Sequence, residues 1–390
     1  MEDNVVGRPQ DHTSALDRGT PPMTGLRLVA DDLTGALDAA IAFVTPGQHV
    51  PVYWNAPPSV APSRLSIDSG TRETDAASAR ARVAALLRNI TPDADTLFFA
   101  KLDSLLRGQA AAEIAAWMEA LQPRRCIIAP AFPRQGRVTR GGIQYLCRDG
   151  AERPVGADLR ATLEAEGHPV HLRRPGEAMP EGVSLWDSET DTDLAQIVAA
   201  GRPADGTTLW CGSGGLAAAL TGHPSGIDVA PRTLPRPILG LFGTNHPVTV
   251  AQLAACGDAV LALSADGPDN AAALGNKLAA DGVALARLAL PEGTPRPVAA
   301  ARIAEAFSSL VAQLDPPGTL IVSGGETLRS LCAALGAERL DLYGQIESGV
   351  PCSILRGGRF DGVHIISKSG AFGAPSLLRR LTETSEGDDA

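Results

Sequence analysis

Two adjacent aspartates, Asp31 and Asp32, lie where an apolar strand is followed by a helix in the segment LRLVADDLTGALDA. Residues 26–30 have the pattern of a buried parallel strand, and the helix is expected to begin near Ala36. A single aspartate at this position can cap a helix by accepting hydrogen bonds from free backbone N–H groups. Two adjacent acids repel each other, however, and open α/β sheets bind ligands at the carboxyl ends of their strands. We therefore expect at least one of the two aspartates to contact a ligand or a metal ion.

The segment KLDSLLRG follows a second apolar strand, residues 96–100, and would lie at the same sheet edge. Lys101 and Arg107 could hold the carboxylate of a substrate, the arginine through two parallel hydrogen bonds. Asp103 and Ser104 could form hydrogen bonds with its hydroxyl groups. The alternative is a surface turn with a local Lys–Asp pair, which would contribute little to stability.

Two further segments carry arginines. SGTRET follows a strand at residues 66–68 and supplies Arg72. An arginine before a helix is more often a solvated charge, so only its place beside the other strand ends makes Arg72 a candidate. AFPRQGRVTRGG, residues 131–142, has three arginines among glycines. It is either a cationic loop over an anionic substrate or a solvated surface loop.

Two glycine-containing turns in the C-terminal half follow apolar strands. IVSGGETL places Gly324, Gly325, Glu326 and Thr327 at one strand-to-helix turn, and SKSGAFG places Lys368 and Gly370 at another. Backbone N–H groups at such turns can bind phosphate, although the spacing and lysine of a Walker A motif are missing. Each turn alone could be a tight turn of no further significance, but two in one domain indicate a nucleotide site.

A third turn, GTNHPVT, places Thr244 and His246 where they could reach the same ligand. A lone histidine there is more often a helix cap or a surface residue. WCGSGGLAAAL has several glycines but lacks the G-x-G-x-x-G spacing of a dinucleotide site, and close helix–strand packing accounts for them.

These segments lie in an alternation of strand-like and Ala-rich helical runs that predicts an α/β fold. A stretch rich in Pro and Gly separates two such sets and is expected to be a linker. We predict two domains, each a mostly parallel sheet flanked by helices, with the active site in the cleft between them. The expected parts are a disordered leader (1–24), an N-terminal domain (25–222), a linker (223–237), a C-terminal domain (238–381) and a disordered tail (382–390).

Composition excludes several classes of protein. The chain has 390 residues, which favours two domains, and it has no run of about 18 apolar residues that could span a bilayer. The first 24 residues lack the apolar core of a signal peptide. A formal net charge of −10 argues against a protein that grips nucleic acid phosphates. Six cysteines lie far apart without a CxxC pair, which argues against a zinc site or a disulfide framework and favours a reducing cytoplasm.

Seven motifs in order make the chain similar to the four-carbon acid sugar kinases. They are ADDLTGALD, TRE, KLDSLLRG, AFPRQGR, GSGGLA, SGGET and SKSGAFG. The resemblance implies a sugar-binding N-terminal domain, a nucleotide-binding C-terminal domain, and transfer of phosphate from ATP to the terminal hydroxyl of threonate, erythronate or 3-oxo-tetronate. The chain departs from the family at GTNH, where a GS-x-S pattern is common, and at Leu105, where Thr is frequent.

The resemblance also implies roles for the motif residues. The acid sugar would be bound by Asp31, Asp32, Arg72, Lys101, Leu102, Asp103, Ser104 and Arg107. ATP would be bound by Thr244, His246, Gly324, Gly325, Glu326, Thr327, Lys368 and Gly370. Mg²⁺ would bridge the phosphates, with no protein residue assigned as its ligand, and catalysis would rest mainly on positioning and charge stabilisation. Asp32 and Asp103 are the candidates for orienting or deprotonating the acceptor hydroxyl.

Two other classes of function stay open. A non-catalytic sugar-acid sensor could use the same site, and ADP formation dependent on a sugar acid would exclude it. A dehydrogenase is disfavoured because no dinucleotide fingerprint is present. We expect no nucleic acid or membrane partner and a location in the cytoplasm. The sequence leaves the oligomeric state open, with a homodimer as the candidate.

Overall fold

The computed structural model describes residues 24–54, 61–88, 95–148, 150–202, 206–222, 234–264, 267–291 and 293–383. The expected leader up to residue 23, most of the expected linker and nearly all of the expected tail lie outside these ranges. Within the described ranges, no helix is long and apolar enough to cross a membrane.

The N-terminal half contains eight strands that all run parallel. Their spatial order is β2-β3-β1-β4-β11-β5-β10-β9. Their bounds are β1 Gly25–Ala30, β2 Val50–Tyr53, β3 Arg64–Asp68, β4 Thr96–Lys101, β5 Arg125–Ala129, β9 Val170–Arg173, β10 Gly182–Trp186 and β11 Thr208–Gly212. The expected candidate residues follow β1, β3 and β4, so the parallel arrangement brings them to one edge.

Helices cover both faces of these strands. One face is covered by α2 (Ala76–Leu87), α3 (Ala110–Leu121) and α4 (Leu159–Ala165), which pack against one another. The other is covered by α1 (Leu33–Ala40), continued by the short 3-10 helix η1 (Ile41–Phe43), with α5 (Asp191–Gly201) and α6 (Gly214–Thr221). Apolar residues on both faces of β1 and β4 are buried, as expected for strands between two helical layers.

A small antiparallel sheet projects from the N-terminal half after the 3-10 turn η2 (Pro133–Gln135). It consists of β6 (Arg137–Arg140), β7 (Ile143–Arg148) and β8 (Ala151–Pro154). The sequence predicted a loop at residues 131–142, and the structure shows that Arg137–Arg140 of this segment form a strand.

The C-terminal half has five parallel strands and one hairpin. The parallel strands are β12 (Ile238–Phe242), β13 (Val260–Ser264), β14 (Val283–Ala289), β15 (Thr319–Ser323) and β18 (His364–Lys368). The hairpin is β16 (Arg339–Gln345) and β17 (Pro351–Arg356). The helices are α7 (Pro247–Ala254), α8 (Asn270–Asp281), α9 (Arg296–Gln313), α10 (Gly325–Ala334) and α11 (Leu377–Thr382), with the 3-10 turn η3 (Gly257–Ala259).

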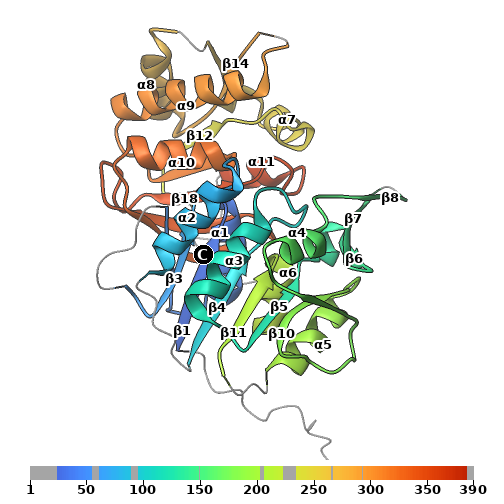
Figure 1. Cartoon of the computed structure of the whole chain (residues 1–390). Helices are drawn as coiled ribbons and strands as arrows, with labels where there is room; N and C mark the ends of the chain where they lie inside the picture. The colour runs from blue at the N-terminus through green and yellow to red at the C-terminus, as the bar shows by residue number, and fades with distance from the viewer. Residues whose placement is uncertain are drawn as a thin grey trace, which may run out of the picture.

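The two halves are joined more closely than the sequence predicted. Strand β2 pairs with β16 in antiparallel register, with Val52 opposite Leu340, so all 15 of these strands form one continuous sheet. One buried apolar cluster also runs from α1 of the first half to α10 of the second. Figure 1 shows the C-terminal half, yellow to red, above the blue and green N-terminal half. The α/β class is confirmed, and the two mostly parallel sets of strands share a core.

Candidate active site

Arg72 lies among three aspartates that follow neighbouring strands. It forms a two-point ion pair with Asp31, through Nε to Oδ2 and through Nη2 to Oδ1 at 2.7 Å. Its Nη2 is also 3.1 Å from Oδ1 of Asp32 and 3.6 Å from Oδ1 of Asp103. The guanidinium therefore relieves the repulsion between the adjacent acids, which the sequence argument took as a sign of a ligand or metal.

The two adjacent aspartates have different surroundings. Asp32 caps α1, because its Oδ1 accepts a hydrogen bond from the Gly35 N–H at 2.7 Å and its Oδ2 accepts one from the Thr34 hydroxyl at 2.8 Å. The helix therefore begins at Leu33, earlier than predicted. Asp31 is buried, and burial raises its pKa although Arg72 lowers it. The Asp32 side chain is 27% exposed, so it is the one of the two that solvent or a ligand can reach.

Asp103 is held by donors from its own turn. Its carboxylate accepts hydrogen bonds from Arg107 Nε and Nη2, both at 2.8 Å, and from the backbone N–H groups of Leu105 and Arg107. Leu106 has a φ of 52°, a left-handed conformation that tightens this turn. Burial alone would raise the pKa of Asp103, but Arg107, Arg72 and Lys101 together lower it far below its usual value. Asp103 is thus a stable anion and a weak base.

The other predicted residues of KLDSLLRG differ in how much of each side chain a ligand could contact. Lys101 is buried, and its Nζ donates to the Leu102 carbonyl at 2.9 Å. Leu102 belongs to the apolar core, so it could offer a ligand only its backbone. Ser104 is partly exposed, and Arg107 is exposed with its fork directed at Asp103. The structure therefore brings together the six charged residues predicted in this half, which are Asp31, Asp32, Arg72, Lys101, Asp103 and Arg107.

Glu113 is a buried acid beneath this cluster that the sequence argument did not select. The Thr71 hydroxyl donates to its Oε1, and the same hydroxyl is 2.7 Å from that of Ser69. Burial, reinforced by the charge of Asp31, raises the pKa of Glu113 to about 7. Glu113 lies within an Ala-rich helix, where no local pattern separates it from a solvated acid.

The predicted nucleotide turns also lie together. Gly324 has a φ of 111°, and its N–H donates to the Lys368 carbonyl at 3.0 Å. A Cβ on Gly243 would lie 1.9 Å from Oγ1 of Thr327, and one on Gly370 would lie 2.6 Å from Oγ1 of Thr244. Side chains at these glycines would separate the three turns, so their absence permits the close approach.

Lys368 and His246 were predicted to contact the nucleotide, but their side chains form hydrogen bonds within the protein. Lys368 is buried, and its Nζ donates to the Thr249 hydroxyl at 2.7 Å and lies 3.4 Å from that of Ser323. Burial lowers its pKa to about 8. His246 accepts the Val248 N–H through Nδ1 at 3.3 Å and so caps α7. Glu326 is exposed in the first turn of α10.

The two groups of residues meet where α1 and α10 begin. A Cβ on Gly325 would lie 3.0 Å from Oγ1 of Thr34. Arg329 of α10 pairs with Asp68 at the end of β3, and its Nη2 donates to the Trp54 carbonyl at 3.3 Å. The aspartate cluster and the glycine turns are therefore neighbours across the junction of the two halves.

The glycines of GSGGLA serve packing, as the sequence analysis inferred. A Cβ on Gly212 would lie 2.5 Å from the Ala129 carbonyl oxygen, and one on Gly215 would lie 2.8 Å from that of Ala131. Ser213 caps α6 through its hydroxyl.

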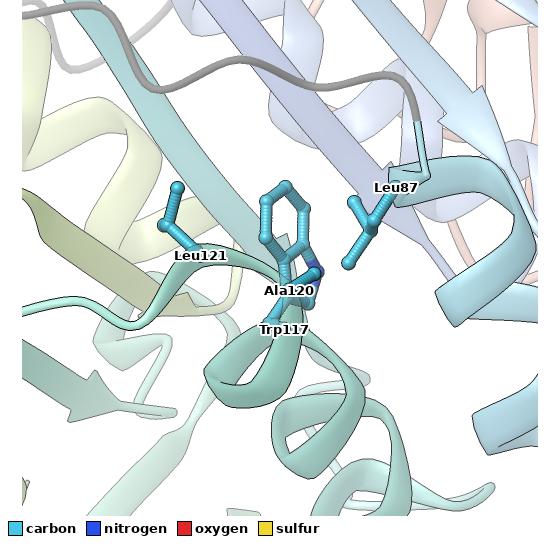
Figure 2. Close-up of a pocket in the computed structure, with 4 residues that line it drawn as sticks. All are labelled: Leu87, Trp117, Ala120 and Leu121. Carbon is cyan, nitrogen blue, oxygen red and sulfur yellow. The ribbon is translucent and has the colours of Figure 1, made fainter.

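Two other kinds of site find little support. Among the described residues, no group of three or more His, Cys, Asp or Glu side chains is arranged to hold a metal ion. A shallow depression lined by Leu87, Trp117, Ala120 and Leu121 lies beside α2 and α3 (Figure 2). Its lining is apolar and offers no group for chemistry.

All six cysteines are free thiols, and four of them are buried.

Comparison with known proteins agrees with this arrangement. A sugar-binding N-terminal domain matches residues 26–171, and a nucleotide-binding C-terminal domain matches residues 248–378. A D-threonate kinase of Cupriavidus necator is 32% identical over 90% of this chain and 95% of its own. A 3-oxo-tetronate kinase of Pseudomonas fluorescens is 27% identical over 92% of this chain and 96% of its own. The chain belongs to the four-carbon acid sugar kinase family.

The fold is also shared with a solved structure. A protein of Salmonella typhimurium LT2, described as a putative tRNA synthase, has a TM-score of 0.72. The two chains are 20% identical, and the match covers 92% of this chain and 98% of the other.

Proposed function

We propose that the protein transfers the terminal phosphoryl group of ATP to the terminal hydroxyl of a four-carbon sugar acid. The observation that carries the proposal is the junction of α1 and α10, where an aspartate cluster faces three glycine turns across Thr34 and Gly325. A kinase needs an acceptor site and a phosphate site within reach of one another, and positioning supplies much of the catalysis.

The C-terminal turns supply the phosphate side. Backbone N–H groups at the start of α10 point toward the junction, where the helix dipole favours an anion. The buried ammonium of Lys368 lies beneath these turns and adds positive charge without contacting solvent directly. We assign it a positioning role, because it also holds Thr249, whose hydroxyl donates to the Gly370 carbonyl at 2.8 Å.

The N-terminal cluster supplies the acceptor side. Asp32 is the best placed base, since it is the more exposed of the adjacent pair and lies next to Thr34 at the junction. Asp103 has too low a pKa to accept a proton readily, so we assign it to binding a hydroxyl and to charge balance. Arg72 holds Asp31, Asp32 and Asp103 in place through its ion pairs.

Mg²⁺ fits this site as a companion of the nucleotide. Mg²⁺ is usually held by one or two carboxylates together with substrate phosphates, so no all-protein cluster is needed. Glu326, exposed in the first turn of α10, is the side chain that would complete its coordination, which leaves Asp32 free to act as the base. When bound, the ion would neutralise charge on the phosphates.

The substrate is tested by a screen for ADP release. The purified protein is given ATP and Mg²⁺ with threonate, erythronate and their 3-oxo forms, each as separate stereoisomers. D-threonate is the first candidate, because the relatives from Cupriavidus necator and Bordetella bronchiseptica are D-threonate kinases. ADP formation that requires one of these acids supports the proposal, and binding of acid and ATP without ADP formation would instead indicate a sensor. A homodimer stays a prediction that sedimentation can check.

A further inference from the structure

The proposed reaction needs a cation for the carboxylate of the sugar acid, and among the described residues the Arg137 guanidinium takes no part in the ion pairs of the aspartate cluster. We propose that Arg137 binds this carboxylate and that Asp38, which lies beside Phe132 next to Arg137, accepts a hydrogen bond from a substrate hydroxyl. The inference rests on the proposed function and names the side chains that select an acid over an alcohol.

The other two arginines of the aspartate cluster already have carboxylate partners, and the buried Lys101 ammonium donates to the Leu102 carbonyl. Arg72 directs Nε and Nη2 to Asp31, and Nη2 also lies within 4 Å of Asp32 and Asp103. Arg107 directs Nε and Nη2 to Asp103. A substrate carboxylate would have to displace a carboxylate of the chain from either guanidinium, which costs the desolvation of a buried acid.

Arg137 differs from both. It begins β6, and two backbone hydrogen bonds with Phe132 fold the loop so that the two residues are adjacent. Its Nη1 donates to the backbone and side-chain oxygens of Gln135, but its Nε is buried and has no hydrogen-bond partner. Within the described part of the chain, no carboxylate lies at ion-pair distance from Arg137. A buried donor without a partner is costly, so a bound anion would stabilise it.

Asp38 approaches the same place from α1. It lies three residues after Gly35 and therefore on the same helical face, where Lys101 Nζ is 3.5 Å from a Cβ built on Gly35. A Cβ on Gly214 would lie 2.7 Å from Asp38 Oδ2 and 3.2 Å from Phe132 Cε1. Asp38 thus borders Phe132, to which Arg137 is hydrogen bonded. In the portion of the chain that the structure covers, its carboxylate forms no hydrogen bond or ion pair.

These groups match the two ends of a short polyhydroxy acid. The guanidinium edge that carries Nε suits a carboxylate, to which arginine can donate two parallel hydrogen bonds. The Asp38 carboxylate can accept from a hydroxyl, and the charges of Lys101 and Arg137 oppose the effect of burial, which raises the pKa of Asp38. A four-carbon alcohol could still reach Asp38 but would leave Arg137 without a partner.

The test compares the sugar acid with the four-carbon alcohol of the same stereochemistry, as a substrate or as a competitive inhibitor. Arg137→Gln should weaken binding of the acid about ten- to a hundredfold, the range for a hydrogen bond between charged groups, and should leave affinity for the alcohol and for ATP nearly unchanged. The affinity of Arg137→Lys for the acid should lie between those of Arg137→Gln and the wild type, because lysine keeps the positive charge but cannot donate two parallel hydrogen bonds to a carboxylate. Asp38→Asn should weaken acid and alcohol alike.

Arg140→Gln is the matched control, because Arg140 lies at the other end of β6 and pairs at the surface with Glu152 and Glu189. It should keep the preference for the acid. If Arg137→Gln does not fold, as judged by thermal unfolding, Arg137→Lys decides. Unchanged preference for the acid in the Arg137 variants, with loss of that preference in Arg72→Lys, would place the carboxylate on Arg72 and overturn the inference. The proposed function would fail separately, through absence of ADP formation by the wild type.

Discussion

Arg72 holds the aspartate cluster together, because it forms ion pairs with acids from the ends of two neighbouring strands. The sequence identified Asp31, Asp32 and Asp103 because they directly follow apolar strands. It did not single out Glu113 or Asp38, which lie inside helices, and it left Arg137 as one of three arginines in a segment that could equally be a solvated loop. Only the tertiary fold separates these three from ordinary solvated charges.

Asp32→Asn tests whether a carboxylate assists transfer. Asparagine caps a helix as well as aspartate does, so the fold should be kept, while loss of a general base should lower kcat by about 10²-fold or more. Steady-state kinetics at saturating acid and ATP measure this. Asp75→Asn is the control, because Asp75 caps α2 in the same way and is exposed. Normal kcat with weakened acid binding would make Asp32 a binding group only.

Glu113→Gln tests the buried acid beneath the cluster. The pKa of Glu113 is about 7 in the folded protein and about 4.5 in an unfolded chain, so the folded state binds more protons between these values. Its contribution to the free energy of unfolding therefore falls as pH rises from about 4.5 through 7. Urea unfolding should show the variant gaining stability relative to the wild type between pH 5 and pH 8.

Glu119→Gln is the control for this pH effect, since Glu119 lies on the same helix, is exposed, and has its pKa lowered by Arg80. Its stability relative to the wild type should not change between pH 5 and pH 8. The same constancy in Glu113→Gln would contradict the account of a raised pKa.

Most strands and helices could be predicted from apolar periodicity and from Gly, Pro and Asp at their ends. Strands β2 and β16 could not, and these are the two that join the halves. β2 has only four residues and contains Pro51, which is unusual in a strand interior. In β16, Leu340 and Leu342 alternate with polar residues, a period-two signal that is short and interrupted by a bulge before Gly344.

Gly325→Val tests the contact between the first turns of α10 and α1. A Cβ at Gly325 would already lie 3.0 Å from Thr34, so a branched side chain should push α10 away and weaken ATP binding. Calorimetry with a non-hydrolysable ATP analogue measures this. Gly275→Ala, in α8, is the control, because its Cβ would meet only Leu314 at 3.9 Å. Unchanged nucleotide affinity in a folded Gly325→Val protein would remove this turn from the ATP site.

Both halves of the molecule contribute to one 15-stranded sheet, and the ion pair between Arg329 and Asp68 links the halves beside the site. Arg329→Gln should lower the free energy of unfolding by about 1–2 kcal/mol at pH 8, since the Asp68 side chain is buried whereas Arg329 is partly screened by solvent. This decrease in the free energy of unfolding should be smaller at pH 6 than at pH 8. Burial raises the pKa of Asp68 to about 7, so at pH 6 the acid is largely neutral and its ion pair with Arg329 is already weakened. Arg160→Gln, which breaks an exposed pair within α4, should have little effect at either pH.

³¹P NMR can follow phosphoryl transfer directly in a mixture of the wild-type protein, ATP, Mg²⁺ and D-threonate. We expect the ATP signals to decline while signals for ADP and for one phosphomonoester grow in equal amounts, with phosphorus–proton coupling that places the phosphate on the terminal carbon. No phosphomonoester from D-threonate or from any other four-carbon acid, with ATP left intact, would contradict the proposed function.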